Sequence, residues 1–204
     1  TAEQRGLALD PDVVLATQCY TAMCLAGMGF GFAGIPFFWW IARRYGKRTG
    51  LACVLSLAIC AFIGDWWLYD PELPLLQLFA GGFVAFTGAG FWTLYTATLG
   101  DVGDYDEAET GQRREGSFAA CGSWISKVGL ALGNMTSGWV LQFTGFDAKL
   151  PVQGDDALLL IRIFLSGIPI LGLCAALVIV SRYFLTERRM HEIRAELEAR
   201  RGTV

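Results

Sequence analysis

Long stretches without a charged residue, or with a single one, occupy most of this chain of 204 residues. They cover residues 13–42, 49–69, 73–100, 117–146 and 157–181. The three charges inside them are Asp65, Lys127 and Arg162. A bilayer core about 30 Å thick needs about 20 apolar residues of helix, and the backbone in lipid must bond within its own helix. The sequence therefore predicts an all-α integral membrane protein with five transmembrane helices.

The basic residues predict how these helices are oriented. Twelve of the sixteen lie in the first loop, the third loop and the tail, which five spans place on one side. These are Arg43, Arg44, Lys47, Arg48, Arg113, Arg114, Arg182, Arg188, Arg189, Arg194, Arg200 and Arg201. The opposite side has only Arg5 and Lys149. Because loops rich in Lys and Arg remain in the cytoplasm, we expect a multi-pass protein of a bacterial-type inner membrane, with the N-terminus outside and the C-terminus inside.

Composition and the other patterns exclude several classes of function. A net charge of −3 gives no basic character for binding nucleic acid. The sequence Gly29-x-Gly31-x-x-Gly34 has dinucleotide-binding spacing but lies inside an apolar run, without the strand and acid that this motif requires. Six cysteines lie in apolar stretches, and His191 is the only histidine. We therefore expect no enzyme, no metal site and no bound cofactor.

The segment 186–201 is predicted to form a cytoplasmic tail helix. Met190, Ile193 and Leu197 share one face of it, and Glu196 is spaced to pair with Arg200. We interpret it as an exposed or membrane-resting helix rather than a helix that binds a partner.

Two charged features stand out from this background. The stretch 100–116 is predicted to be a cytoplasmic loop, with six acids and two arginines in seventeen positions. Lys127 lies about ten residues into its span, roughly 15 Å deep at the rise of an α-helix. A lysine at that depth costs about 2.5–3.5 kcal/mol on insertion scales, so it usually faces water and serves a function.

The stretch FWTLYTATLGDVGDYDEAETGQRREGSFAACGSWISKVGLALG resembles the glycoside-pentoside-hexuronide:cation symporter family of the major facilitator superfamily. The shared motif is Asp-x-x-Asp-Tyr, here Asp101, Asp104 and Tyr105, followed by a Thr-Gly, an Arg-Glu and the lysine. The resemblance implies that residues 1–204 are a partial C-terminal bundle, helices 8–12 of a twelve-helix fold. The chain begins at Thr1, and we expect helix seven and the N-terminal half to be missing from it.

The resemblance also implies roles for particular residues. Lys127 and Trp92 match positions that border the path of the substrate and the coupling cation. Five charged residues match a cluster that closes the cytoplasmic side, namely Asp101, Asp104, Glu107, Arg113 and Glu115. The coupling cation, Na⁺ or H⁺, would bind mainly in the missing N-terminal half.

The sequence thus predicts part of a cation-coupled sugar or glycoside symporter that works by alternating access. Its expected partners are the lipid bilayer, a small solute and the missing half of the same transporter. Two alternatives remain open: a same-fold transporter of a non-sugar solute, and a non-transporting membrane scaffold. Substrate, coupling ion and oligomeric state are not specified by the sequence.

Overall fold

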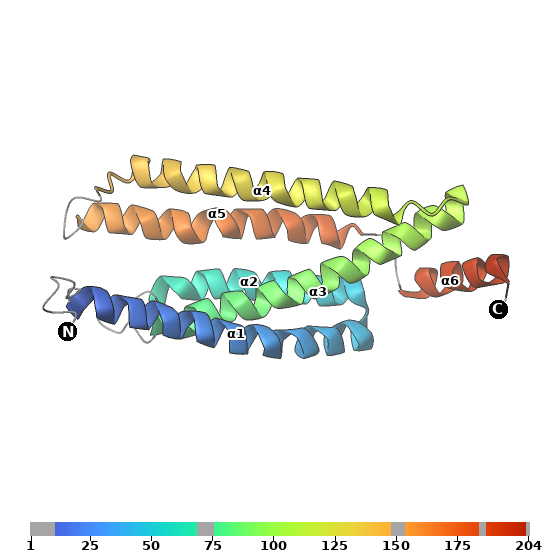
Figure 1. The fold of residues 1–204 in the computed structure, drawn as a ribbon, viewed down its shortest axis with the longest axis horizontal. Helices are drawn as coiled ribbons and strands as arrows, with labels where there is room; N and C mark the ends of the chain where they lie inside the picture. Colours follow the sequence, from blue (N-terminus) through green and yellow to red (C-terminus); the bar gives the residue numbers. More distant parts are fainter. Residues whose placement is uncertain (1–10, 69–75, 148–153, 184–186, 203–204) are drawn as a thin grey trace, which may run out of the picture.

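The computed structural model describes residues 11–68, 76–147, 154–183 and 187–202. Its elements in chain order are α1 (Pro11–Tyr45), α2 (Lys47–Leu68), α3 (Leu76–Thr110), α4 (Glu115–Phe143), α5 (Asp155–Ser181) and α6 (Glu187–Arg201). The first five run back and forth along one long axis, and α6 lies at one end beside the last turns of α3 (Figure 1). The predicted all-helical fold is confirmed, and every predicted span corresponds to one helix.

Four of the described helices are long and apolar enough to cross a membrane. They are α1 from Thr17, α2, α3 and α5 from Asp156. The remaining long helix, α4, has 29 residues, about 43 Å at the α-helical rise, and contains Lys127. It runs beside α5 over most of that helix's length (Figure 1). The fifth span therefore stays a prediction, which the length and placement of α4 support.

Small residues allow α1 to pack closely on α3. Gly27 and Gly31 of α1 lie against Ala85 and Ala89 of α3. A Cβ built on Gly34 would overlap the carbonyl oxygen of Phe86. In a membrane, where apolar burial does not drive helices together, such close backbone contact is what holds them.

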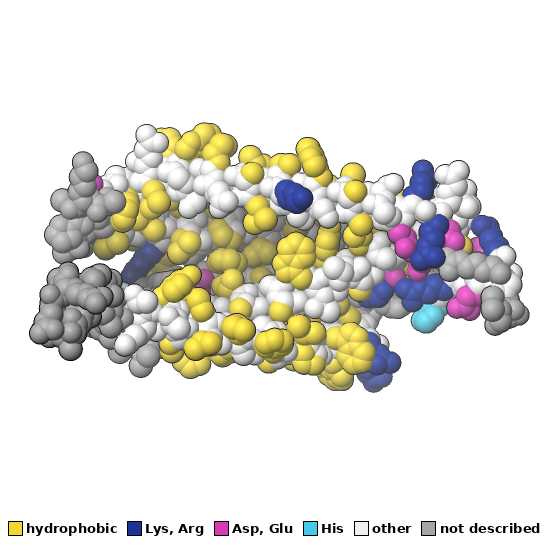
Figure 2. Space-filling model, viewed as in Figure 1, with side chains coloured by type: hydrophobic (Ala, Val, Ile, Leu, Met, Phe, Trp, Pro, Cys, Tyr) yellow, Lys and Arg dark blue, Asp and Glu magenta, His cyan; other side chains and the backbone are white. Residues whose placement is uncertain are grey.

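A core of buried apolar residues lies where α1, α2 and α3 meet at one end of the bundle. Its members are Phe38, Ile41, Ala42, Leu51, Val54 and Leu94. At the same end Gly46, with a φ of 91°, forms the whole connection between α1 and α2. Only glycine adopts this left-handed backbone at low cost, so α2 can begin directly at Lys47. We call this end the charged end, because acidic and basic side chains gather there (Figure 2).

Two sequence predictions about the charged end are wrong. The stretch 100–116 is not mainly a loop, because α3 continues as a helix to Thr110 and only a short connection precedes α4. The apolar face of the tail helix is neither exposed nor available to rest on a membrane, because Met190, Ile193 and Leu197 are buried against Val102, Tyr105, Ala108 and Tyr183, while the opposite face is exposed as predicted. The two errors share one cause. The extension of α3 carries an apolar stripe that α6 covers, and each helix supplies the apolar surface that the other needs.

Candidate functional site

A carboxylate at the charged end has two basic partners from distant parts of the chain. Asp101 is only 4% exposed. The Lys47 Nζ donates to both of its oxygens, at 2.8 and 2.7 Å. The Arg194 guanidinium donates to Asp101 Oδ1 at 2.7 Å and to Asp104 Oδ2 at 3.3 Å. We call these four residues the Asp101 cluster.

The cluster joins three helices. Lys47 is the first residue of α2, Asp101 and Asp104 lie one turn apart on α3, and Arg194 lies on α6. Lys47 also donates to the carbonyl of Ala97 at 3.3 Å. Because the carboxylate is buried while its partners are half-buried, the attraction acts in a medium less polar than bulk water and is correspondingly stronger.

Further contacts fasten α6 to α3 beside the cluster. Arg200 donates to the carbonyl of Ala108 at 2.9 Å and pairs with Glu196, as its spacing predicts. Burial, followed by the negative charge of Asp101, raises the pKa of Tyr183 to about 12. Tyr183 is therefore neutral at physiological pH and adds no charge to this end of the molecule.

The other predicted gate charges have separate partners. Arg113 donates to its neighbour Glu115 at 3.1 Å, and both side chains are largely exposed. The structure therefore does not bring Arg113 to Asp101 or Asp104. Glu107 lies on the same α3 extension, three residues after Asp104. The residues that do bind Asp101, Lys47 and Arg194, were missed as site residues because each is far from it in sequence.

Lys127 lies near the middle of α4 with its side chain exposed. Among the residues that the structure describes, it has no hydrogen bond or ion pair. Its helix is also loosely packed in this chain, since no described residue of α4 between Glu115 and Phe143 is buried. The cationic group is therefore not neutralised by any described residue of this chain.

Trp92 lies on α3 in a group of aromatic rings. Its indole is 54% exposed and stands edge-on to Phe91 and to Tyr95, at ring distances of 5.9 and 5.7 Å. A Cβ built on Gly122 of α4 would lie 2.5 Å from the Tyr95 hydroxyl, so these two residues lie at one level. Trp92 is three residues before Tyr95, and Lys127 is five residues after Gly122. Because the two helices are antiparallel, both residues lie on the same side of that level, and their depths differ by about two residues, or about 3 Å. The structure brings the two predicted site residues to a common depth without direct contact.

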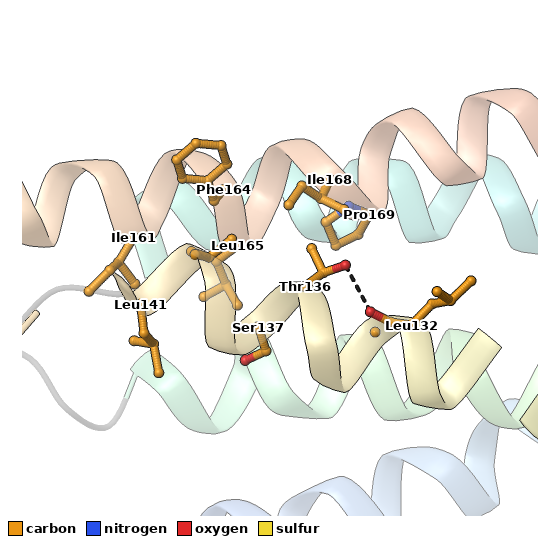
Figure 3. A pocket seen from close by; sticks show the side chains of 11 residues that line it. Leu132, Thr136, Ser137, Leu141, Ile161, Phe164, Leu165, Ile168 and Pro169 are labelled. Atoms are coloured by element: carbon orange, nitrogen blue, oxygen red, sulfur yellow. Dashed lines mark hydrogen bonds between the residues drawn. The ribbon is translucent and has the colours of Figure 1, made fainter. Parts of the chain in front are cut away.

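An open apolar groove of about 600 Å³ runs between α4 and α5. Its lining includes Leu132, Gly133, Leu165 and Ile168 (Figure 3). The Thr136 hydroxyl is used within its own helix, where it donates to the carbonyl of Leu132 at 2.8 Å (Figure 3). The groove is poorly suited to a sugar, which needs several hydrogen-bond partners, and Lys127 and Trp92 are not part of its lining. No group of three or more candidate metal ligands occurs among the described residues.

Comparison with known proteins identifies the family. A family model described as "MFS/sugar transport protein" matches residues 11–187. The chain belongs to this family. The resemblance found in the sequence is thereby confirmed.

Individual relatives agree with this assignment. An uncharacterised symporter of Synechocystis is 36% identical over 168 residues, which are 74% of this chain and 30% of the relative. The putative glycoside/cation symporter YagG of Escherichia coli is 31% identical over 188 residues, 90% of this chain and 36% of that protein. The isoprimeverose transporter of Lactiplantibacillus pentosus is 31% identical over 134 residues, 65% and 28% of the two chains. The chain thus spans about a third of the length of the curated relatives it matches.

Proposed function

We propose that this chain is the C-terminal part of a cation-coupled carrier that takes up a sugar or glycoside by alternating access. The names of the relatives support a sugar-like solute and a coupling cation. In such carriers the solute binds near the middle of the bilayer, between two halves that expose it to each side in turn. The single observation that carries the proposal is the exposed cation of Lys127, halfway along a helix of a membrane bundle.

A lysine in this place is costly unless it faces water, a solute or an acid. Lys127 has no such group within the described chain, so its partner comes from the substrate path or from the missing half. We propose that it faces the aqueous path and links solute binding to cation binding. Trp92, at a similar depth, presents a flat apolar face and an N–H donor beside that path.

The Asp101 cluster is our candidate for a gate on the cytoplasmic side. It ties the start of α2 to the end of α3, and α6 covers the same extension. Ion pairs that join separate helices can be broken and remade as a carrier changes state, so the cluster is suited to a contact that exists in one state only. Of the predicted gate charges the cluster contains Asp101 and Asp104, whereas Arg113 is paired with Glu115.

The missing part of the transporter accounts for the exposed surfaces of α4 and α5. Each half of such folds contains two inverted repeats of three helices. If this chain is helices 8–12, then α4 occupies the place in the second repeat that α1 has in the first, and α5 the place that α2 has. In this chain α1 packs closely on α3, while α4 makes few contacts and its Gly129 and Gly133 face open space. We propose that a helix preceding this chain fills the groove between α4 and α5. The proposed orientation keeps the charged end in the cytoplasm, and the coupling ion, Na⁺ or H⁺, binds mainly in the N-terminal half.

The experiment is uptake of radiolabelled isoprimeverose and of a glucuronide by the full-length carrier in vesicles, driven by a Na⁺ or a pH gradient. We expect Lys127→Leu to insert at wild-type levels, because a charge is removed from the membrane, and to lose accumulation. Lys127→Arg should also accumulate poorly, because a planar guanidinium does not replace a compact ammonium.

Arg189→Gln provides the matched control, because Arg189 is an exposed base whose partner is its near neighbour Glu192. It should accumulate solute normally. Normal accumulation by Lys127→Leu would show that the lysine is structural, and the assignment of the solute path would then be wrong.

A further inference from the structure

Asp65 is a buried acid near the end of α2 that lies opposite the charged end. Its side chain is only 4% exposed, and its Oδ1 has no hydrogen-bond partner among the residues that the structure describes. It is the only acid in α2. Nothing in the proposed solute path or gate uses it. A carboxylate in apolar surroundings is unstable without a compensating group, so the position calls for a partner.

Asp65 lies on the face of α2 that packs toward α3 and α5. It follows the buried residues Val54 and Ala58 by eleven and seven positions, which keeps all three on one side of the helix. Val54 and Ala58 line a cleft with Leu173 and Ala176 of α5. Asp65 therefore continues the surface of α2 that meets α5.

Arg162 is the only basic residue of α5, and it lies on the facing side of that helix. It precedes Leu173, Ala176 and Val180 by 11, 14 and 18 residues, close to whole numbers of turns. Leu173 and Ala176 line the cleft with α2, and Val180 packs on the core of α1, α2 and α3. Arg162 is half-buried, as expected for a side chain on this inward face.

The two charges also lie at the same depth. Arg48 at the start of α2 donates to the carbonyl of Ser181 at the end of α5, which fixes the level of these antiparallel helices. Asp65 is 17 residues along α2 from Arg48, and Arg162 is 19 residues back along α5 from Ser181. The difference of two residues is about 3 Å.

The other helices that contact α2 offer no competing base at this level. Between Leu76 and Gly100, α3 has no charged residue. The basic residues of α1 are Arg43 and Arg44, at the charged end. Among the described parts of the helices around Asp65, Arg162 is therefore the base within reach.

We propose that Asp65 and Arg162 form an exchangeable ion pair across the α2–α5 interface. Arg162 has a different contact in the conformation described here. In a second conformation its guanidinium turns to the carboxylate of Asp65 and joins the outer halves of the two helices. The pair is independent of the Asp101 cluster, which lies at the opposite end of the same bundle.

The test is a double-mutant cycle on the purified full-length carrier, read as thermal unfolding in detergent and as the amount of folded protein in the membrane. The variants are Asp65→Asn, Arg162→Gln, both together, and the charge exchange Asp65→Arg with Arg162→Asp. Coupling between contacting charges should change the unfolding equilibrium about twofold to a hundredfold beyond the sum of the single effects. Each double variant should lose less free energy of unfolding than the losses of its two single variants added together.

Asp156→Asn combined with Arg162→Gln is the matched control, because Asp156 is an exposed acid at the start of α5. Its effects should add. Additive effects for Asp65 and Arg162, or a charge exchange less stable than either single variant, would overturn the pair. Because the readout is stability, its failure would leave the proposed transport function untouched, and a failed uptake experiment would not affect this result.

Discussion

Replacing Asp101 by Asn removes one charge from the Asp101 cluster and leaves its shape almost unchanged. The side chains of Asp101 and Lys47 are 6% and 25% exposed, so this is the most buried of the ion pairs between described residues. Breaking a buried pair by removing one partner costs about 3–5 kcal/mol, because the other charge remains. Arg194 is 47% exposed and its share is smaller, about 0–1 kcal/mol.

We take about 3 kcal/mol as the expected loss, because Lys47 is partly hydrated and the Asn oxygen can still accept one of its hydrogen bonds. For a protein of about 150–250 residues, each kcal/mol moves the unfolding midpoint by about 2–4 °C. Asp101→Asn should therefore lower the midpoint by about 6–12 °C in a purified chain of 204 residues, and by less in the longer full-length carrier, whose entropy of unfolding is larger. Differential scanning fluorimetry in detergent measures this directly.

Arg113→Gln is the control, because its ion pair with Glu115 is exposed on both sides and should contribute about 0–1 kcal/mol. If Asp101→Asn and Arg113→Gln lower the midpoint equally, the cluster does not hold α2, α3 and α6 together. If Lys47→Met restores part of the stability of Asp101→Asn, the loss comes from the uncompensated cation, as argued here.

Two further changes test the packing. Gly34→Ala should destabilise the α1–α3 contact by about 1–3 kcal/mol, because the new methyl group meets the backbone of Phe86. The control Gly29→Ala meets nothing within 4 Å and should be neutral or stabilising. Equal unfolding midpoints for the two variants would contradict the close packing. Ile193→Asp should release α6 from α3 and make the arginine-rich tail sensitive to trypsin. The control Ala195→Asp changes the exposed face and should leave the tail resistant. Equal resistance of the two variants to trypsin would show that α6 is not held by its apolar face.

The helices could be predicted from the sequence because a membrane imposes one rule on every span. Apolar length alone located α1, α2, α4 and α5 and the start of α3 within a few residues, and spacing identified the buried face of α6. The extension of α3 was missed because hydropathy falls at Asp101, although Val102, Tyr105 and Ala108 continue an apolar stripe at helical spacing. That stripe was the available signal.

The partners of the candidate site could not be read in the same way. Arg194 lies 93 residues from Asp101, and Lys47 lies 54 residues from it. Nothing in the spacing distinguishes them from the other bases of the tail and the first loop, because only the packing of α6 and the turn at Gly46 bring them together. Lys127 could be singled out because a single charge within a span is conspicuous by itself, whereas Trp92 was named only through the family resemblance.

The length of α3 has a mechanical consequence. Its 35 residues extend about 53 Å, while the hydrocarbon core of a bilayer is about 30 Å thick. Roughly 15 residues must project beyond the hydrocarbon, and the acids from Asp101 onward place this excess at the charged end. A rigid rod that projects so far converts a small tilt within the membrane into a larger sideways displacement at its tip. With α6 fastened to that tip, a tilt of α3 by 10° would carry the tail helix several ångströms, which a pair of fluorescent labels on α6 and α2 could follow.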